Sequence, residues 1–238
     1  MEVASLYREP PREEARPEAA VEFHDVFKIY RSGPAETVAL RGLDLRIERG
    51  EHVAVLGPSG SGKSTFLHLA AGLEDPSAGE VRIFGQPLNR LDEADLAKFR
   101  ARRIAIVFQS ENLLPLLTAR ENVATSVRLG GIDRARAVAT SALTTVDLEA
   151  RATHRPGALS GGEQQRVAVA AALARSASLV LADEPTGELD LGNERRVLEE
   201  LRRLRDELGS TVVTVTHSAR LAETADRVIE IRDGRVVA

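Results

Sequence analysis

The chain has 238 residues, enough for one large domain or two small ones, and its 43% hydrophobic content permits a packed core. Cysteine is absent, which excludes disulfides, thiolate chemistry and zinc–cysteine sites, and no apolar run approaches the ~20 residues of a membrane-spanning helix. The net charge of −4 makes general nucleic-acid binding a poor expectation, although it does not exclude a local basic patch.

Residues 1–20 are rich in Pro, Glu and Arg and contain little apolar surface. This composition predicts a mobile, solvated tail, which we favour over a partner-binding arm. The segment lacks the apolar centre of a signal peptide, so we expect any membrane role to come through a partner.

Two stretches ahead of the first glycine-rich loop predict two or three antiparallel strands. Residues 21–30 (VEFHDVFKIY) alternate between apolar and polar side chains, and residues 37–47 give further strand-like sequence. Tyr30, one of two tyrosines, comes at the end of the first stretch. Its ring could stack on a nucleotide base, although taken alone it is more typical of a core or edge tyrosine.

Residues 57–65 match the phosphate-binding pattern G-x-x-x-x-G-K-[ST]. Residues 52–56 (HVAVL) predict a buried strand before it, and residues 63–71 predict the start of a helix after it. Glycines allow backbone N–H groups to converge on phosphate oxygens, and a helix N-terminus adds partial positive charge. This context favours a phosphate site over an ordinary glycine-serine turn. The predicted loop consists of Gly57, Pro58, Ser59, Gly60, Ser61, Gly62, Lys63, Ser64 and Thr65.

Two side chains of this loop have predicted roles of their own. In this pattern the lysine, here Lys63, reaches the β- and γ-phosphates, and the hydroxyl of Ser64 binds Mg²⁺. The sequence therefore predicts a site for a nucleoside triphosphate and Mg²⁺.

A second buried strand carries a polar residue at its end. Residues 80–88 predict a strand with a hairpin continuation, and residues 93–102 predict a short helix. The apolar run 104–108 (IAIVF) then predicts a buried strand that is followed by Gln109. At the carboxyl edge of a parallel sheet such a side chain can point into a site, although it could also cap a loop.

The strand signals fade from residue 112 onward, which predicts a helical subdomain of about residues 112–165. A helix is expected over 119–129 with Thr118 as its N-cap, and a second over 133–146. The apolar segment 113–117 (LLPLL) suggests a docking surface if it is exposed, and internal packing of the subdomain if it is not.

Residues 159–166 (LSGGEQQR) precede an apolar helical run. Ser160 is a good N-cap, and Gly161 and Gly162 leave the start of the helix bare. The segment could form a second anion-binding helix terminus, although alone it is more typical of a plain capped helix.

Residues 179–182 (LVLA) predict a short buried strand that ends in two carboxylates, Asp183 and Glu184. Adjacent carboxylates at such a position are costly unless they meet a cation or take part in chemistry. Successive strand residues point to opposite sides, so one carboxylate could hold Mg²⁺ through water while the other faces an attacking water. A pair of solvated loop acids is the alternative.

The last part of the chain also alternates between predicted helices and strands. Residues 191–208 predict an amphipathic helix whose charges suit a solvated, salt-bridged face better than a nucleic-acid stripe. Residues 211–216 predict a strand that places His217 at the same sheet edge as Gln109 and the two carboxylates, and residues 228–237 predict a closing hairpin.

This order of elements predicts an α/β fold for residues 21–238. Alternating strands and helices imply a mainly parallel sheet covered on both faces, as in a P-loop NTPase core. The early strands would form a flanking antiparallel β-subdomain, and the helical subdomain would be an insert. We find no internal repeats.

With these motifs in this order, the chain from about residue 21 to its C-terminus resembles the ATP-binding subunit of ABC transporters. The sequence LSGGEQQR is the most specific of the motifs. The resemblance makes Tyr30 the adenine-stacking aromatic, Gln109 the Q-loop residue, Asp183 and Glu184 the end of the Walker B strand, Leu189 and Asp190 the D-loop, and His217 the switch histidine.

The resemblance also implies a mechanism. Two copies would face each other head to tail around two ATP molecules, each contacting the P-loop of one chain and Ser160, Gly161 and Gly162 of the other. Glu184 would be the general base, His217 would contact the γ-phosphate and orient water, and Lys63 and Mg²⁺ would offset the developing charge. The implied catalytic residues are Glu184, His217, Lys63 and Gln109, and the implied Mg²⁺ ligands are Ser64, Gln109 and Asp183.

An integral-membrane permease is the implied partner, with this chain peripheral on the cytoplasmic face of the membrane, as a homodimer or paired with a related subunit, and with no nucleic acid. The segments HLAAGLEDPSAG, ENLLPLLTARENV and EPTGELD look like the lipoprotein-release, macrolide-export and cell-division group, although Glu188 stands where that group usually has asparagine. A force-transmitting ATPase of cell division or envelope remodelling fits the sequence equally. A soluble ABC ATPase acting on DNA or ribosomes fits less well, because such proteins usually carry coiled-coil or zinc insertions or a second cassette.

Overall fold

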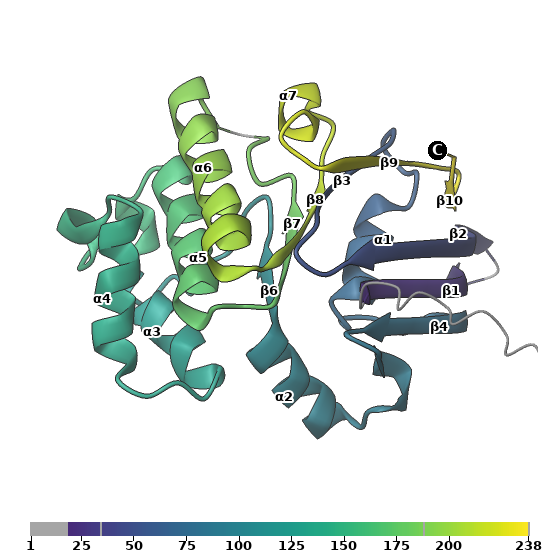
Figure 1. Ribbon diagram of the computed structural model, residues 1–238, viewed down its shortest axis with the longest axis horizontal. Helices are drawn as coiled ribbons and strands as arrows, with labels where there is room; N and C mark the ends of the chain where they lie inside the picture. The colour runs from purple at the N-terminus through teal and green to yellow at the C-terminus, as the bar shows by residue number, and fades with distance from the viewer. Residues whose placement is uncertain (1–18, 34, 188, 238) are drawn as a thin grey trace, which may run out of the picture.

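The computed structural model describes residues 19–33, 35–187 and 189–237. An antiparallel sheet, a mainly parallel sheet with helices on both faces, and a helical insert follow one another across the molecule (Figure 1). This arrangement confirms the predicted α/β fold. Most of the predicted tail, residues 1–18, and Glu188 lie outside the described residues. Ala19 and Ala20, which we assigned to the tail, instead begin the first strand and are buried, because Ala19 pairs with Glu48.

The six-stranded sheet has the order β10-β9-β3-β8-β7-β6, and β10 is antiparallel to β9. Its strands are β3 (His52–Leu56), β6 (Ile104–Val107), β7 (Leu179–Asp183), β8 (Thr211–Val215), β9 (Arg227–Arg232) and β10 (Arg235–Val236). The five strands from β9 to β6 run parallel, so their carboxyl ends meet at one edge. Their near-continuous Val, Ile, Leu and Ala content suits a sheet buried on both faces.

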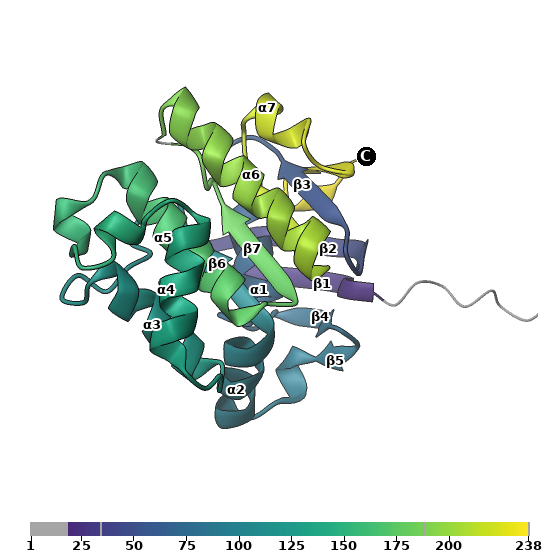
Figure 2. The same ribbon diagram turned by 60° about the vertical axis from the view of Figure 1, so that its left-hand side comes forward.

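Alternate residues of the parallel strands serve two different cores. Leu179 and Leu181 pack with the antiparallel sheet and with α1 (Lys63–Ala70). Val180 and Ala182 pack with α5 (Gly161–Arg175) and α6 (Leu191–Leu208) on the opposite face. Figure 2 shows α6 lying across the face of the sheet that α1 does not cover. The short helix α7 (Ala219–Ala222) follows β8.

The antiparallel sheet has the order β2-β1-β4-β5. Two of its strands, β1 (Ala19–Ser32) and β2 (Ala35–Glu48), precede β3, and β4 (Ala78–Ile83) and β5 (Gln86–Pro87) return to it after α1. The sheet and α1 are joined through the rings of Phe23 and Phe66, whose centroids lie 4.9 Å apart. The segments η1 (Leu88–Arg90) and α2 (Glu93–Arg103) then lead to β6.

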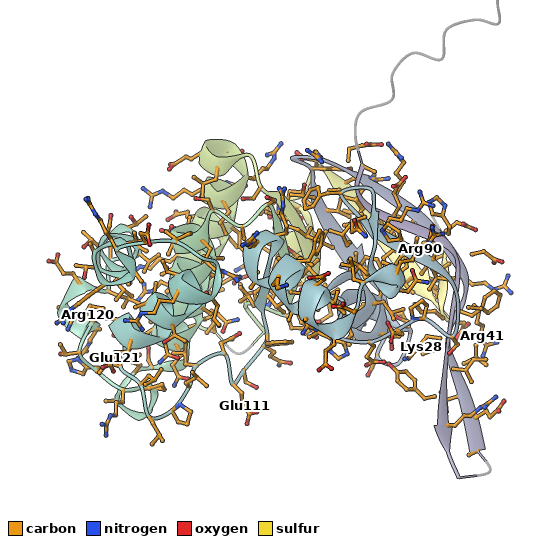
Figure 3. The ribbon with its side chains drawn as sticks, turned by 90° about the horizontal axis from the view of Figure 1, so that it is seen from below. Lys28, Arg41, Arg90, Glu111, Arg120 and Glu121 are labelled. Carbon is orange, nitrogen blue, oxygen red and sulfur yellow. The ribbon has the colours of Figure 1, made fainter. Side chains whose placement is uncertain are left out.

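The insert contains α3 (Ala119–Leu129), α4 (Ala135–Thr145), η2 (Glu149–Arg151) and η3 (Pro156–Ala158), which pack on α5 around a core of their own. The predicted bounds of α3 are confirmed, and Thr118 forms a capping box with Glu121. The second helix is shorter than predicted and begins at Ala135, because Arg134 takes a left-handed conformation with a φ of 54°. Figure 3 shows Arg120 and Glu121 on this helical half and Lys28 on the half formed by the antiparallel sheet.

Across residues 19–33, 35–187 and 189–237, no helix is both long enough and apolar enough to cross a membrane.

Candidate nucleotide site

A cavity of about 530 Å³ opens at the carboxyl edge of the parallel sheet. The predicted phosphate loop lines it with every residue except Ser61, whose buried side chain lies outside the lining. The strand-end residues Gln109, Asp183, Glu184 and His217 line the same cavity. The sequence therefore placed residues from four separate segments correctly at one edge of the sheet.

Two glycines allow the phosphate loop to take its path. Gly57 has a φ of 157° and Gly62 a φ of 106°. A Cβ atom on Gly57 would collide with the carbonyl oxygen of Ile231, and one on Gly62 would lie 2.5 Å from the carbonyl oxygen of Ala39. The loop is thus packed tightly between two sheets, and Gly62 forms the N-cap of α1 with its backbone alone.

Lys63 extends back across the loop. Its Nζ donates hydrogen bonds to the carbonyl oxygens of Gly57, at 2.8 Å, and Pro58, at 2.9 Å. The ammonium is therefore fixed on the cavity side of the loop, next to the N-terminus of α1. Both the ammonium and the helix terminus favour an anion at this position.

Asp183 and Ser64 form the part of the site that suits a metal ion. Burial raises the pKa of Asp183, a hydrogen bond with Ser64 opposes this shift, and the charge of Glu184 adds to it. A buried carboxylate beside a hydroxyl is the oxygen donor set that Mg²⁺ prefers, and a cation would offset the cost of burying the charge. The residues described include no cluster of three or more acidic or histidine ligands, so these two groups fit an ion that is otherwise held by water and phosphate.

Glu184 takes a left-handed conformation with a φ of 45°, which is uncommon for a residue with a side chain. Its Oε1 lies 2.8 Å from Nδ1 of His217. Its Oε2 accepts hydrogen bonds from the hydroxyl of Thr216, at 3.0 Å, and the backbone N–H of His217, at 3.3 Å. The two adjacent carboxylates therefore engage different partners, but the left-handed turn at Glu184, just after the end of β7, separates them instead of the predicted strand alternation.

Gln109 follows β6, and the chain just before it is tied to α5. Asn112 Oδ1 accepts a hydrogen bond from the backbone N–H of Phe108, and its Nδ2 donates to Gln165 at 2.9 Å. Gln165 in turn donates to the carbonyl oxygen of Phe108 at 2.7 Å. We did not identify Asn112 or Gln165 from the sequence, because Asn112 lies in a loop and Gln165 stands among other polar residues at the start of α5.

The second glycine-rich segment does not reach this cavity. Ser160 caps α5 in a reciprocal capping box with Glu163, and Ser160 and Gly161 are exposed. Gly162 is buried against Asn193 near the start of α6, where a Cβ atom would overlap the Asn193 side chain. The N-terminus of α5 therefore lies outside the cavity of its own chain, and Gly161 instead lines a neighbouring hollow.

Tyr30 borders the cavity without lining it. Its hydroxyl lies 3.4 Å from Oγ1 of Thr65, which does line the cavity, and it donates to Glu74 at 2.8 Å. Its β2 neighbour Thr37 also lines the cavity. The residue is 38% exposed, so the ring lies at the rim of the cavity rather than in the core.

The apolar segment 113–117 is divided between the two predicted roles. Leu113 packs on the core of the insert, whereas Leu114 and Leu116 are 54% and 78% exposed. Beside them a hollow of about 720 Å³ lies between this segment and the start of α5, and Gln109 and Gln165 also line it. The hollow thus connects the surface of the insert to the nucleotide cavity through Gln109.

Comparisons with known proteins agree with these features. A family described as "ABC transporter" matches residues 40–187. The chain is 46% identical over 220 residues to "Lipoprotein-releasing system ATP-binding protein LolD" of Geobacter metallireducens, covering 92% of this chain and 98% of the relative. It is 43% identical over 220 residues to "Macrolide export ATP-binding/permease protein MacB" of Azoarcus sp., covering 92% of this chain and 33% of that protein.

A solved structure matches with a TM-score of 0.86 and 41% sequence identity, covering 92% of this chain and 97% of the other. It is described as "Dimeric structure of a post-hydrolysis state of the ATP-binding cassette MJ0796 bound to ADP and Pi".

Proposed function

The chain belongs to the ABC transporter family of ATP-binding proteins, and from this membership we propose that it energises an integral-membrane permease from the cytoplasmic face of a membrane. It is an ATP hydrolase of the ABC type. The names of its relatives support the finer proposal. LolD is the ATP-binding protein of a lipoprotein-releasing system, and MacB joins an ATP-binding part and a permease in one protein, of which this chain matches 33%.

The separation of the phosphate loop from the second glycine-rich terminus carries the proposal. The cavity contains the loop and the catalytic candidates, while Ser160 and Gly161 are exposed elsewhere on the same chain. Two copies arranged head to tail would bring each α5 N-terminus to the other copy's cavity. The dimeric cassette bound to ADP and phosphate supports this arrangement.

In this arrangement the chain's own groups bind the triphosphate. Backbone N–H groups of the loop and the ammonium of Lys63 would hold the β- and γ-phosphates. Ser64, Asp183 and Gln109 would hold Mg²⁺, which supplies charge stabilisation at the phosphate oxygens. The N-terminus of α5 from the other copy would complete the phosphate contacts.

Glu184 is the proposed general base. Its carboxylate would accept a proton from the attacking water, and the hydrogen bond to His217 fixes its direction. His217 is exposed at the cavity and would turn its ring to the γ-phosphate. Once hydrolysis removes this shared contact, the two copies can separate, which is a ligand-driven conformational switch.

The surface around Leu114 and Leu116 is the proposed docking site for the permease. The bonds among Phe108, Asn112 and Gln165 join this region to α5, so a movement at Gln109 would be passed to the surface of the insert. Both leucines are exposed, and their chain neighbours Leu113 and Pro115 line the hollow, so the segment offers an apolar contact for a partner.

Isolation of the Glu184→Gln variant from mildly solubilised membranes in the presence of ATP tests the proposal. We expect a multi-span membrane protein to be recovered in stoichiometric amount. A soluble homodimer alone, or recovery of nucleic acid, would contradict the permease assignment.

Replacement of Leu114 and Leu116 by glutamine is expected to reduce recovery of the membrane partner while ATP binding is retained. The matched control replaces Leu129 and Leu208, which are 67% and 43% exposed on other surfaces. Recovery measured by quantitative mass spectrometry should fall in the first double variant and remain unchanged in the second. Equal recovery from both would move the docking site away from this segment.

Tyr30→Ala is expected to weaken ATP binding by on the order of 10- to 100-fold, because an aromatic ring that stacks on a base contributes about 1–3 kcal/mol. Binding of tripolyphosphate, which has no base, should not change. Calorimetric Kd values for both ligands check this, with Tyr30→Trp as a control that keeps a stacking ring. Equal ATP affinity in the alanine variant and the parent would return Tyr30 to a structural role.

A further inference from the structure

Tyr30 is held by a cluster of charged and polar side chains that the mechanism above does not use. Its hydroxyl donates to Glu74 Oε2 at 2.8 Å, and Glu74 lies in the segment that leads from α1 to β4. Burial raises the pKa of Tyr30, and the hydrogen bond to Glu74 raises it further, against the opposing bond to Thr65. The phenol is therefore protonated at neutral pH and remains a donor to the carboxylate.

Lys28 completes one side of the cluster. Lys28 and Tyr30 are two residues apart on β1, with an irregularity in the strand pairing at Lys28 and Ile29. The Lys28 ammonium lies 2.9 Å from Glu74 Oε2 and donates to the carbonyl oxygen of Asp75 at 2.8 Å. It also lies over the Tyr30 ring, 5.1 Å from its centroid. One face of the ring is thus covered by a cation, which leaves the opposite face for a base.

The cluster also contacts the helix that carries the phosphate site. Nδ1 of His68, on α1, lies 3.2 Å from Glu74 Oε1, and Thr65 on the same helix lies 3.4 Å from the Tyr30 hydroxyl. Partial burial raises the pKa of Glu74, but hydrogen bonds from Lys28, Tyr30 and His68 outweigh it and hold the pKa below its usual value. Glu74 therefore remains charged and joins the β1 ring to the helix that begins at Lys63.

We propose that Glu74 is a positioning residue for nucleotide binding, which fixes the ring of Tyr30 at a set distance from the phosphate loop. Glu74 does not line the cavity, so it acts through the ring. A ring already fixed in its binding orientation loses less conformational freedom when a base stacks on it. The inference rests on the proposed stacking role of Tyr30. It concerns only the contact with the nucleotide base, because other groups make the phosphate contacts.

Glu74→Ala tests this inference. We expect KM and Kd for ATP to rise about threefold to tenfold, which is the usual effect of mobilising one side chain at a binding surface. The kcat should stay within about twofold of the parent, and Kd for tripolyphosphate should not change. Glu74→Gln can still accept a hydrogen bond from the Tyr30 hydroxyl but lacks the ion pair with Lys28. Its KM and Kd for ATP should therefore lie between those of the parent and those of Glu74→Ala.

Asp75→Ala is the matched control. Asp75 is the next residue and also a carboxylate, but its side chain makes no hydrogen bond or ion pair within the described ranges. The change removes the same charge from the same segment, and we expect no effect on KM or Kd for ATP. A rise in KM and Kd as large as that of Glu74→Ala would show a general disturbance of this segment instead of positioning through the ring, and would overturn the inference.

A double-mutant cycle with Tyr30→Phe separates positioning from general support of the fold. The phenylalanine keeps a stacking ring but removes the hydroxyl that Glu74 holds, so it should weaken ATP binding about as much as Glu74→Ala. The double variant should be no weaker than either single variant. Additive losses, or an equal loss of tripolyphosphate binding in Glu74→Ala, would overturn the inference.

Failure of the positioning role of Glu74 is distinguishable from failure of the stacking role of Tyr30. If Tyr30→Ala weakens ATP binding and Glu74→Ala does not, the positioning role is wrong and the stacking role stands. If Tyr30→Ala has no effect on ATP, both fail together. The ATP hydrolase assignment does not depend on either result.

Discussion

Glu184→Gln is expected to lower kcat for ATP hydrolysis by about 10²- to 10⁴-fold, the usual contribution of a general base, while ATP binding remains close to normal. Glutamine has nearly the size of glutamate but cannot accept a proton from water. Its single acceptor oxygen can keep only part of the bonding that Glu184 makes to Thr216 and His217. Because the bound ATP persists, the variant should also accumulate as an ATP-dependent dimer.

Steady-state phosphate release and light scattering with and without ATP measure the two effects. Glu80→Gln provides a matched control, because Glu80 is also a partly buried, ion-paired carboxylate, with 19% side-chain exposure against 15% for Glu184. It lies on β4, outside the cavity lining, and should leave kcat unchanged. Turnover near the parent rate in Glu184→Gln would remove this residue as the base.

Those parts of the fold that depend on local signals could be predicted from the sequence. The bounds of α3 follow from Thr118 and Glu121, three residues apart at the start of an apolar period, which is the capping-box pattern. The convergence of Gln109, Asp183, Glu184 and His217 could also be predicted, since each stands at or just after the end of a buried strand and parallel strands end at one edge. In both cases neighbouring residues define the geometry.

Features that depend on contacts between distant segments could not be predicted in this way. Lys28 and Glu74 are far apart in the sequence, and each would pass for an ordinary surface charge. They meet because β4 returns to pair with β1, with Val21 opposite Ile83, a pairing that sequence periodicity does not specify. The same holds for Gly162 and Asn193, which meet only where α5 packs on α6.

Single-residue backbone geometry was a second limit. Glu184 and Arg134 both take left-handed conformations, although neither is a glycine or asparagine. At Arg134 this conformation ends the loop before α4 and shortens the predicted helix. At Glu184 it aims the carboxylate at His217. In each case the conformation is imposed by surrounding structure and leaves no signal in the residue type.

Lys63→Ala is expected to weaken ATP binding by at least about 100-fold, because it removes a charge-assisted hydrogen-bond donor at the phosphates. In the present structure the ammonium also joins the carbonyl oxygens of Gly57 and Pro58, so its loss frees the loop as well. The freed carbonyl groups border an open cavity and can bond to water. Stability should therefore change little, and the loss should appear in binding and in hydrolysis.

Calorimetry with ATP and with tripolyphosphate separates this variant from those at Tyr30. Lys63→Ala should weaken the binding of both ligands, because the predicted contacts of Lys63 are to phosphate. Changes at the Tyr30 ring should weaken the binding of ATP alone. Lys98→Ala is the control, since Lys98 is 66% exposed on α2 and pairs only with Asp95 among the contacts of the described residues. Unchanged ATP affinity in Lys63→Ala, with a thermal midpoint equal to that of the control, would contradict the phosphate-loop assignment. If Lys63→Ala loses affinity for both ligands, most of the binding free energy comes from the phosphate contacts. The contact with the nucleotide base is then a smaller and separable contribution.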